Sequence, residues 1–186
     1  SEFILEGCQL AQVVRYVVIE KARFTQVRFN RCFFLRPNMS DLRFDKCDMS
    51  NMEWKESKLF KIEIENSKLT GFKLIEADAS NCKFDGCVGE LTQFRGSKFD
   101  NSRFEKCQLR GADFRLADLR GASFSKCDLR DAEFYDAKLQ GTDFRGSDLV
   151  GIKARPDDLK GAIIDSQQAF DLATHFATLL GLEVRD

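Results

Sequence analysis

The chain has 186 residues, a formal net charge of −1 at pH 7 and 32% charged side chains, so a single domain with a sizeable core is expected. The balanced charge provides no global basic field for binding nucleic acid or an anionic membrane surface. No apolar run approaches the roughly 18 residues of a membrane span, and no signal-like segment opens the chain. We therefore expect a cytoplasmic protein that binds neither nucleic acid nor membrane directly.

A five-residue repeat dominates the sequence. From Ile19 to Leu149 a large apolar residue recurs at every fifth position, over 27 consecutive positions, and only Gly89 lacks an apolar side chain. The position two residues earlier is mostly Ala, Ser, Thr or Cys, and the other three are mostly charged, polar or Gly. Because five fits neither the helical nor the strand period, this pattern favours a coil with one large and one small inward side chain per repeat.

The segment GADFRLADLRGASFSKCDLRDAEFYDAKLQGTDFRGSDLV, residues 111–150, resembles the pentapeptide-repeat family, and the resemblance covers about residues 17–151. It implies an all-β solenoid, a right-handed quadrilateral β-helix in which four repeats make one complete turn. On this basis residues 1–151 are expected to form the β-helix, with an irregular first coil over about residues 1–18. Residues 152–186 are expected to provide a loop, a C-terminal capping helix and a terminal strand.

Three places are expected to break the regular coil. Near the N-terminus, Leu5 and Leu10 lie one residue out of the main register, which predicts a slip within residues 11–18. Gly89 marks a second candidate irregularity. Residues 152–160 are the best candidate for an irregular surface loop. Elsewhere the continuous register argues against long loops projecting from the rod.

The C-terminal segment 166–181 has helical spacing. Ala169, Ala173, Phe176 and Leu180 are expected to close the end of the rod, with Asp165 or Ser166 as N-cap and Gly181 as the stop. Further apolar residues extend beyond this face and predict an end-to-end homodimer of two-fold symmetry. Its expected interface comprises Phe170, Ala173, Phe176, Ala177, Leu179, Leu180, Leu182 and Val184.

No catalytic, cofactor-binding or metal-binding residues are predicted, so we expect a protein that is not an enzyme. Cys87, Cys107 and Cys127 recur at every fourth repeat and should stack inside one side of the coil, in the row that also contains Cys47. Such a row fits a thiol metal site, disulfides or buried free thiols; the last is favoured because no His, Asp or Glu is placed to join them. The single histidine, His175, is expected on the helix surface or in an interface.

A closer resemblance lies in two segments. LRFDKCDMSNMEWKESKL (Leu42–Leu59) and LKGAIIDSQQAFDLATHFATLLGLEV (Leu159–Val184) look like the corresponding parts of Qnr-type proteins of Gram-positive bacteria. This resemblance implies a homodimer that binds DNA gyrase or topoisomerase IV and relieves inhibition by fluoroquinolones through mimicry of a DNA duplex. The alternative is a scaffold that binds an unrelated protein through a flat wall.

The outward charges give two candidate contact surfaces. Summed over each side of the predicted coil, they leave no side strongly acidic, so acidity is local to the last coils. The topoisomerase-contact candidates are Asp113, Asp118, Asp128, Asp131, Glu133, Asp136, Asp143 and Asp148. The candidates for an apolar protein-binding wall are Phe33, Leu35, Ile75, Leu116 and Tyr135.

Overall fold

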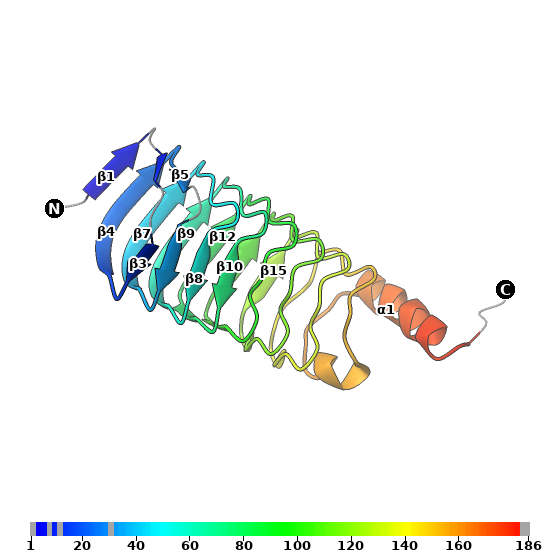
Figure 1. Ribbon diagram of the computed structural model, residues 1–186. Helices are drawn as coiled ribbons and strands as arrows, with labels where there is room; N and C mark the ends of the chain where they lie inside the picture. The colour runs from blue at the N-terminus through cyan, green and yellow to red at the C-terminus, as the bar shows by residue number, and fades with distance from the viewer. Residues whose placement is uncertain (1–2, 7–8, 11–12, 30–31, 183–186) are drawn as a thin grey trace.

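The structure is a computed structural model that describes residues 3–6, 9–10, 13–29 and 32–182. The chain winds into a β-solenoid, a rod of stacked coils with the N-terminus at one end and helix α1 at the other (Figure 1). In chain order the elements are β1 (Phe3–Glu6), β2 (Gln9–Leu10), β3 (Val13–Arg15), β4 (Val18–Thr25), β5 (Arg28–Phe29), β6 (Phe33–Leu35), β7 (Asn38–Asp45), β8 (Glu53–Lys55), β9 (Lys58–Glu65), β10 (Lys73–Ile75), β11 (Asp78–Ser80), β12 (Lys83–Asp85), β13 (Lys98–Asp100), β14 (Arg103–Glu105), β15 (Ser123–Ser125), the 3-10 helix η1 (Pro156–Leu159) and α1 (Ser166–Leu179).

Each coil consists of four five-residue repeats. Val18 pairs in parallel with Asn38, and single bridges continue the same offset as far as Asp143 and Ile163. Since neighbouring strands lie about 4.8 Å apart, each coil lengthens the rod by that distance. The offset holds from Val13 onward, so the described part of the rod contains no inserted loop, as the register predicted.

The four sides of each coil follow from the five-residue repeat. We number them by their first buried large residue, with side 1 at Phe24, side 2 at Phe29, side 3 at Phe34 and side 4 at Met39, and each side continues at every fourth repeat. From Phe24 to Leu149 every such residue is buried, as is the residue two positions before it. The described residues between them are half-buried or exposed, which confirms the predicted inward and outward positions.

Phenylalanines form two stacks inside the rod. On side 1 the rings of Phe104 and Phe124 lie 4.6 Å apart and nearly parallel, and on side 3 those of Phe114 and Phe134 lie 5.1 Å apart. Between the sides, Phe114 meets Phe124 edge to face at 5.6 Å. Pairs of this kind contribute about 0.5–1.5 kcal/mol beyond the stabilisation from burying their surface. Because the Phe residues recur at the same position of successive coils, their stacking holds neighbouring coils together.

Each corner is turned by the residue two positions after the large one. This residue has a positive φ, for example +73° at Gly121 and +75° at Gly141. Glycine adopts that backbone conformation without steric cost. Apart from Gly89, the glycines of the described repeats are therefore corner residues.

The irregularity predicted at Gly89 is wrong. The amide of Gly89 donates to the carbonyl of Gln108 at 2.8 Å, and the neighbouring Val88 bridges the coils on both sides. A Cβ at position 89 would lie only 2.5 Å from Oγ1 of Thr92, which donates to the Gly89 carbonyl. Glycine is therefore required because Thr92 fills the space, and the coil continues in register.

The slip at the N-terminus is confirmed and located. Phe3 pairs with Ala22 and Leu10 with Phe29, whereas Val13 pairs with Phe33. Up to Leu10, paired residues are therefore separated in sequence by one residue fewer than they are from Val13 onward. The first coil is thus shorter than the others by one position, as the predicted slip requires.

The predicted loop at residues 152–160 is shorter than expected. Lys153 still bridges to Glu133 and, beyond the segment, Ile163 bridges to Asp143, so the chain keeps the register of the coil on both sides of η1. Only η1 departs from it, as a single 3-10 turn.

Helix α1 closes the rod through a different face from the one predicted. Asp165 is its N-cap and forms a capping box with Gln168, and Gly181 ends it at φ +72°. The buried residues are Gln168 and Leu172, and Phe176 is half-buried, whereas Ala169, Ala173 and Leu180 are not part of the buried face.

The physical reason is a hydrogen bond. Nε2 of Gln168 donates to the carbonyls of Phe144 at 2.7 Å and Ser147 at 2.6 Å. These carbonyls belong to the last coil, so no following coil supplies backbone amides to donate hydrogen bonds to them. Hydrophobic spacing alone does not reveal this need for a donor. The predicted terminal strand at 182–184 lies mostly outside the described residues.

Candidate functional site

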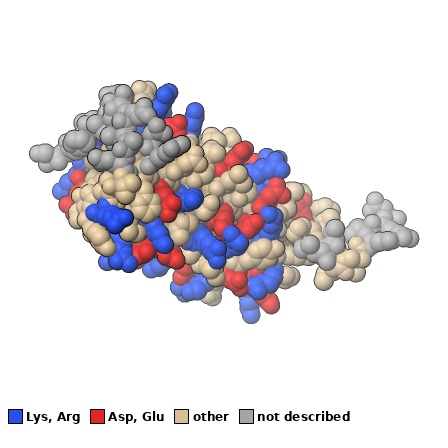
Figure 2. Space-filling view, viewed as in Figure 1, with Lys and Arg blue, Asp and Glu red and all other residues tan. Residues whose placement is uncertain are grey.

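The outer surface of the rod is organised in rows. Because neighbouring coils stack in register, each outward position lies directly on the same position of the next coil, about 4.8 Å away. Acidic and basic side chains are interleaved along the visible side of the rod (Figure 2). A row, rather than a whole side, is therefore the smallest unit of surface that a partner would contact.

All eight carboxylates predicted as contacts are paired with cations. Four of them form an Asp–x–Arg fork, in which the Asp precedes the large inward residue and the Arg follows it. In the clearest case Arg120 donates to both carboxylate oxygens of Asp118 at 2.8 and 2.7 Å. The other forks are Asp113–Arg115, Asp128–Arg130 and Asp143–Arg145.

The remaining four predicted carboxylates are bridged between coils. Asp131 pairs with Arg110, Glu133 with Arg115 and Lys153, Asp136 with Arg155, and Asp148 with Arg130. Exposed pairs of this kind contribute little stability. They do, however, leave the last coils with alternating rather than accumulated charge.

The forks lower the pKa of their carboxyl groups. The hydrogen bonds from Arg120, Arg130 and Arg145 hold the pKa of Asp118, Asp128 and Asp143 below its ordinary value. Burial alone would raise the pKa of Asp113, but the fork from Arg115 outweighs it and the pKa is lowered. These groups therefore stay ionised and bound to arginine at neutral pH.

The eight carboxylates do not share one surface. Their sequence positions place Asp143 on side 1 and Asp118 on side 4, whereas Asp128 and Asp148 lie on side 2 and Asp113 and Glu133 on side 3. Asp131 and Asp136 lie at the two corners that flank side 3. A single flat partner therefore cannot contact all eight. This distribution follows from the four-sided coil, since successive repeats lie on adjacent sides.

A row of like charges on side 1 was missed by the sequence analysis. Asp45, Glu65, Asp85 and Glu105 are in-register neighbours in β7, β9, β12 and β14, and we call them the acidic ladder. Summing charge over the whole side concealed it, because the row on the opposite edge of side 1 contains more basic than acidic residues. Summing along each row separately would have revealed it.

Among the described residues, two basic side chains form ion pairs with carboxylates of the acidic ladder. Arg43 reaches Glu65 at 2.6 Å, and Lys83 lies 2.9 Å from Asp85 and 3.8 Å from Glu105. Like charges directly opposite one another destabilise neighbouring strands. The acidic ladder is therefore not explained by the needs of folding.

A row on side 4 shows the opposite arrangement. Lys58, Asp78, Lys98, Asp118 and Lys138 alternate in sign and are consecutive in-register neighbours. Lys138 lies 3.8 Å from Asp118. The same chain thus uses alternating charge on side 4 and like charge on side 1.

The predicted apolar wall is not continuous. Phe33, Leu35 and Ile75 are half-buried, and Lys55 lies between Leu35 and Ile75 in their row. Leu116 and Tyr135 are the exposed members, 53% and 40% accessible. Only the C-terminal part of the wall therefore offers apolar surface.

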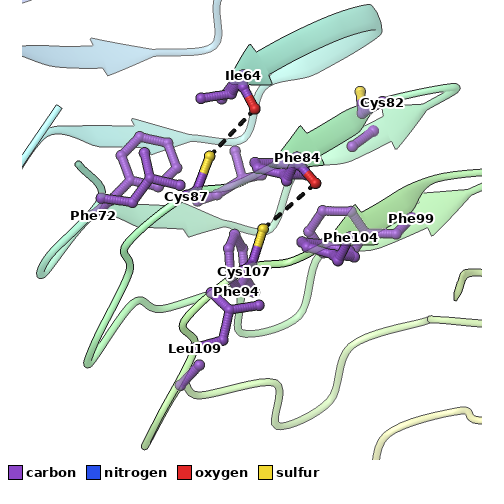
Figure 3. Close-up of a cluster of buried hydrophobic side chains, with 14 of the residues drawn as sticks. Ile64, Phe72, Cys82, Phe84, Cys87, Phe94, Phe99, Phe104, Cys107 and Leu109 are labelled. Carbon is purple, nitrogen blue, oxygen red and sulfur yellow. Dashed lines mark hydrogen bonds between the residues drawn. The ribbon is translucent and has the colours of Figure 1, made fainter. Parts of the chain in front are cut away.

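The six described cysteines are buried, and Cys82, Cys87, Cys107 and Cys127 pack as free thiols. Cys8 lies outside the described residues. The thiol of Cys87 donates to the carbonyl of Ile64 at 3.2 Å and that of Cys107 to the carbonyl of Phe84 at 3.5 Å (Figure 3). Burial raises the pKa of Cys82 to about 11, which keeps this thiol protonated.

The described residues contain no group of three potential metal ligands. His175 is half-buried on α1 with its ring 5.6 Å from that of Phe176. None of the helices described here is long and apolar enough to cross a membrane.

The predicted dimer residues lie at the far end of the rod. Phe170 and Leu180 on and just after α1 are 70% and 76% exposed, and Leu182 and Ala173 are also exposed. Phe176 and Ala177 are half-buried. Val184 lies outside the described residues, as does the side chain of Leu179.

Comparison with family models identifies the repeats. Residues 65–130 match a pentapeptide repeat region, and residues 112–151 match pentapeptide repeats in eight copies. No curated protein sequence matches the chain.

Three solved structures are similar to all or part of this chain. One is QnrB1, a plasmid-mediated fluoroquinolone resistance protein, at 21% identity over 99% of this chain and 98% of that chain, with a TM-score of 0.38. HetL, from the cyanobacterium Nostoc sp. strain PCC 7120, has 19% identity over 89% and 90%, with a TM-score of 0.27. A pentapeptide repeat protein of the Arabidopsis thaliana thylakoid lumen has 26% identity over 57% and 71%, with a TM-score of 0.38. With TM-scores below 0.5, these similarities do not bear on the partner of this chain.

Proposed function

This chain is a pentapeptide-repeat protein, and we propose that it acts without catalysis, by binding a type II topoisomerase and protecting it from fluoroquinolones. The enzyme is DNA gyrase or topoisomerase IV. The resemblance of Leu42–Leu59 and Leu159–Val184 to Qnr-type proteins supports this choice of partner.

The acidic ladder is the observation that carries the proposal. It presents four carboxylates in one straight row, one per coil, about 4.8 Å apart. A DNA strand presents one phosphate per about 3.4 Å of axis. The ladder is therefore the part of the described surface whose charge most resembles a phosphate backbone, and cationic side chains that hold DNA are the groups it would attract.

The paired carboxylates of the last coils are the competing contact region. Their arginines make them alternating donors and acceptors rather than a line of negative charge. A topoisomerase that recognises DNA through cationic side chains gains less from such pairs. We therefore place the main contact on the acidic ladder and a secondary one on the forks.

We also propose that the protein is a homodimer through α1. The exposed side chains of Phe170, Leu180 and Leu182 project from the capped end of the rod. A two-fold axis at this end would bury them against their own copies. Two rods joined in this way would present one continuous, double-length wall.

The test is a supercoiling assay with purified gyrase and ciprofloxacin, with and without this protein. Relief of inhibition is expected; its absence for the wild-type protein would refute the proposed function. The ladder variant D45N/E65Q/D85N/E105Q should lose the relief. The matched control D118N/D128N/D143N/D148N removes the same number of charges from the last coils and should retain most of it, and the reverse result would move the contact to the forks.

A scaffold for an unrelated partner is the second candidate. The near-neutral net charge favours it, as do two exposed apolar residues, Tyr135 on side 3 and Leu116 at the adjoining corner. It predicts no effect on gyrase in the same assay and unchanged partner capture by the ladder variant.

A further inference from the structure

Two leucines occupy corners where a leucine is unfavourable. Leu91 and Leu116 have φ of +55° and +60° and are 67% and 53% exposed. A bulky residue in this conformation is rare and strained, and Gly or Asn adopts it more easily. More than half of the surface of each side chain therefore stays exposed, at a position whose backbone conformation does not favour leucine.

The two leucines flank the same side of the rod. Leu91 is at the corner between sides 2 and 3, and Leu116 is at the corner between sides 3 and 4. The amide of Leu116 donates to the carbonyl of Tyr135 at 3.1 Å, which places Tyr135 beside it in the next coil. Leu91 leans over Gly111, whose added Cβ would lie 3.3 Å from Cδ2 of Leu91.

The polar residues between these leucines divide into two rows. The row on the Leu91 edge is Gln93, Asp113 and Glu133, which are in-register neighbours and offer acceptors. The row on the Leu116 edge consists of Arg95, Arg115 and Tyr135, which offer donors. Side 3 therefore has an acceptor edge and a donor edge in these coils.

We infer that side 3 of these coils binds side 3 of a second copy of the chain. The two rods would lie parallel, related by a two-fold axis along the rod. This operation places the acceptor edge of each copy against the donor edge of the other, so that Asp113 faces Arg115 and Glu133 faces Tyr135 of the second copy. At the same time Leu116 of one copy meets Leu91 of the other above Gly111.

The complementarity selects both the partner and the symmetry. A two-fold axis perpendicular to the rod would place the acceptor edge of one copy against the acceptor edge of the other. With the axis along the rod, the acceptor edge of each copy meets the donor edge of the other, so the same contact forms twice. An interface in which the same patch serves both copies is the usual way that soluble proteins form dimers. Each exposed leucine also finds an apolar contact, which relieves the cost of its exposure.

This interface is separate from the one proposed at α1. It uses the side of the rod, whereas α1 lies at the end (Figure 1). The two interfaces together would assemble four copies. Neither interface depends on topoisomerase binding, so the inference can fail or hold independently of the proposed function.

The test is the molecular mass in solution, measured by light scattering or sedimentation. The variant L91N/L116N introduces residues that tolerate a positive φ, so it should fold at least as well as the wild type. It should halve the mass of the wild-type assembly. In the background F170S/L180S, which removes the helix contact, it should convert a dimer into a monomer.

Two controls make the test specific. Phe60 is exposed on side 4, and F60T should leave the mass unchanged. R115D places acid against acid across the interface and should lose the association, whereas the swap D113R/R115D restores opposite charges both within and between copies and should recover it.

Three outcomes would overturn the inference. They are a monomeric wild type, an unchanged mass for L91N/L116N in both backgrounds, and a swap that behaves like R115D. If L91N/L116N instead loses gyrase binding without a change in mass, side 3 contacts the topoisomerase and not a second copy.

Discussion

Two aspartates in opposite charge environments predict opposite effects of the same substitution. Asp85 lies between Glu65 and Glu105 in the acidic ladder. Asp78 lies between Lys58 and Lys98 on side 4. Replacing either by Asn removes one charge and almost no volume, so the difference between the two variants reports the neighbouring charges.

The magnitude follows from cross-strand pairs. Each opposite or like pair between neighbouring strands is worth roughly 0.2–1 kcal/mol. D78N loses two attractions and should destabilise the protein by about 0.5–1 kcal/mol. D85N loses two repulsions and the half-buried pair with Lys83, itself worth about 0.2–1 kcal/mol, so it should be neutral or stabilising.

The assay is urea unfolding of wild type, D78N and D85N at low and high salt. The stability difference between the variants should approach about 1 kcal/mol at low ionic strength, the worth of about two cross-strand pairs. It should shrink in about 1 M salt, where the screening length falls to about 3 Å. Equal destabilisation by D78N and D85N would refute the argument that the acidic ladder opposes folding.

Three further predictions concern the core, the cap and pH. F114A removes a fully buried ring from a stack and should cost about 3–5 kcal/mol in urea unfolding; a loss below about 1 kcal/mol would show that the stack relaxes around the cavity. Q168L keeps the size of the side chain but removes the Nε2 donor from the carbonyls of Phe144 and Ser147, the first of which keeps only the bond from the Ser147 amide at 3.1 Å. It should therefore lower the melting temperature more than the substitution Q167L on the exposed face of the same helix turn. The folded-state pKa of Asp118 is lowered by Arg120, so the stability that it provides is present above its unfolded pKa of about 3.9 and is lost as pH falls through the folded value. The stability of D118N should therefore fall less than that of the wild type between neutral pH and about pH 3, and parallel pH profiles would contradict this.

The coil could be predicted because its signal is repeated. The inward position recurs 27 times, so the register could be identified although Gly89 lacks an apolar side chain. The offset of four repeats between stacked residues then followed from the four-sided geometry that the family resemblance implies. Local chemistry also sufficed for the ends of the helix, because Asp165 and Gly181 are strong capping residues.

Contacts that occur only once in the molecule could not be predicted from the repeat pattern. The buried face of α1 is set by Gln168, whose amide satisfies two carbonyls of the last coil. Gly89 is set by the hydroxyl of Thr92, which already occupies the space. In both cases the deciding atom lies three or more positions away in sequence, and hydrophobic periodicity carries no information about it.

The surface raises a different problem, because its information is arranged across coils. Residues at the same position of successive coils are neighbours, so Asp45, Glu65, Asp85 and Glu105 form one line although a whole coil of chain separates each from the next. A change in this line leaves the sequence of the core unchanged, because the buried residues stand at other positions of the repeat. A coil of this kind can therefore carry several independent binding rows on one core. The acidic ladder on side 1 and the rows between Leu91 and Leu116 on side 3 are examples. Because they lie on opposite sides of the rod, one copy can use both at once.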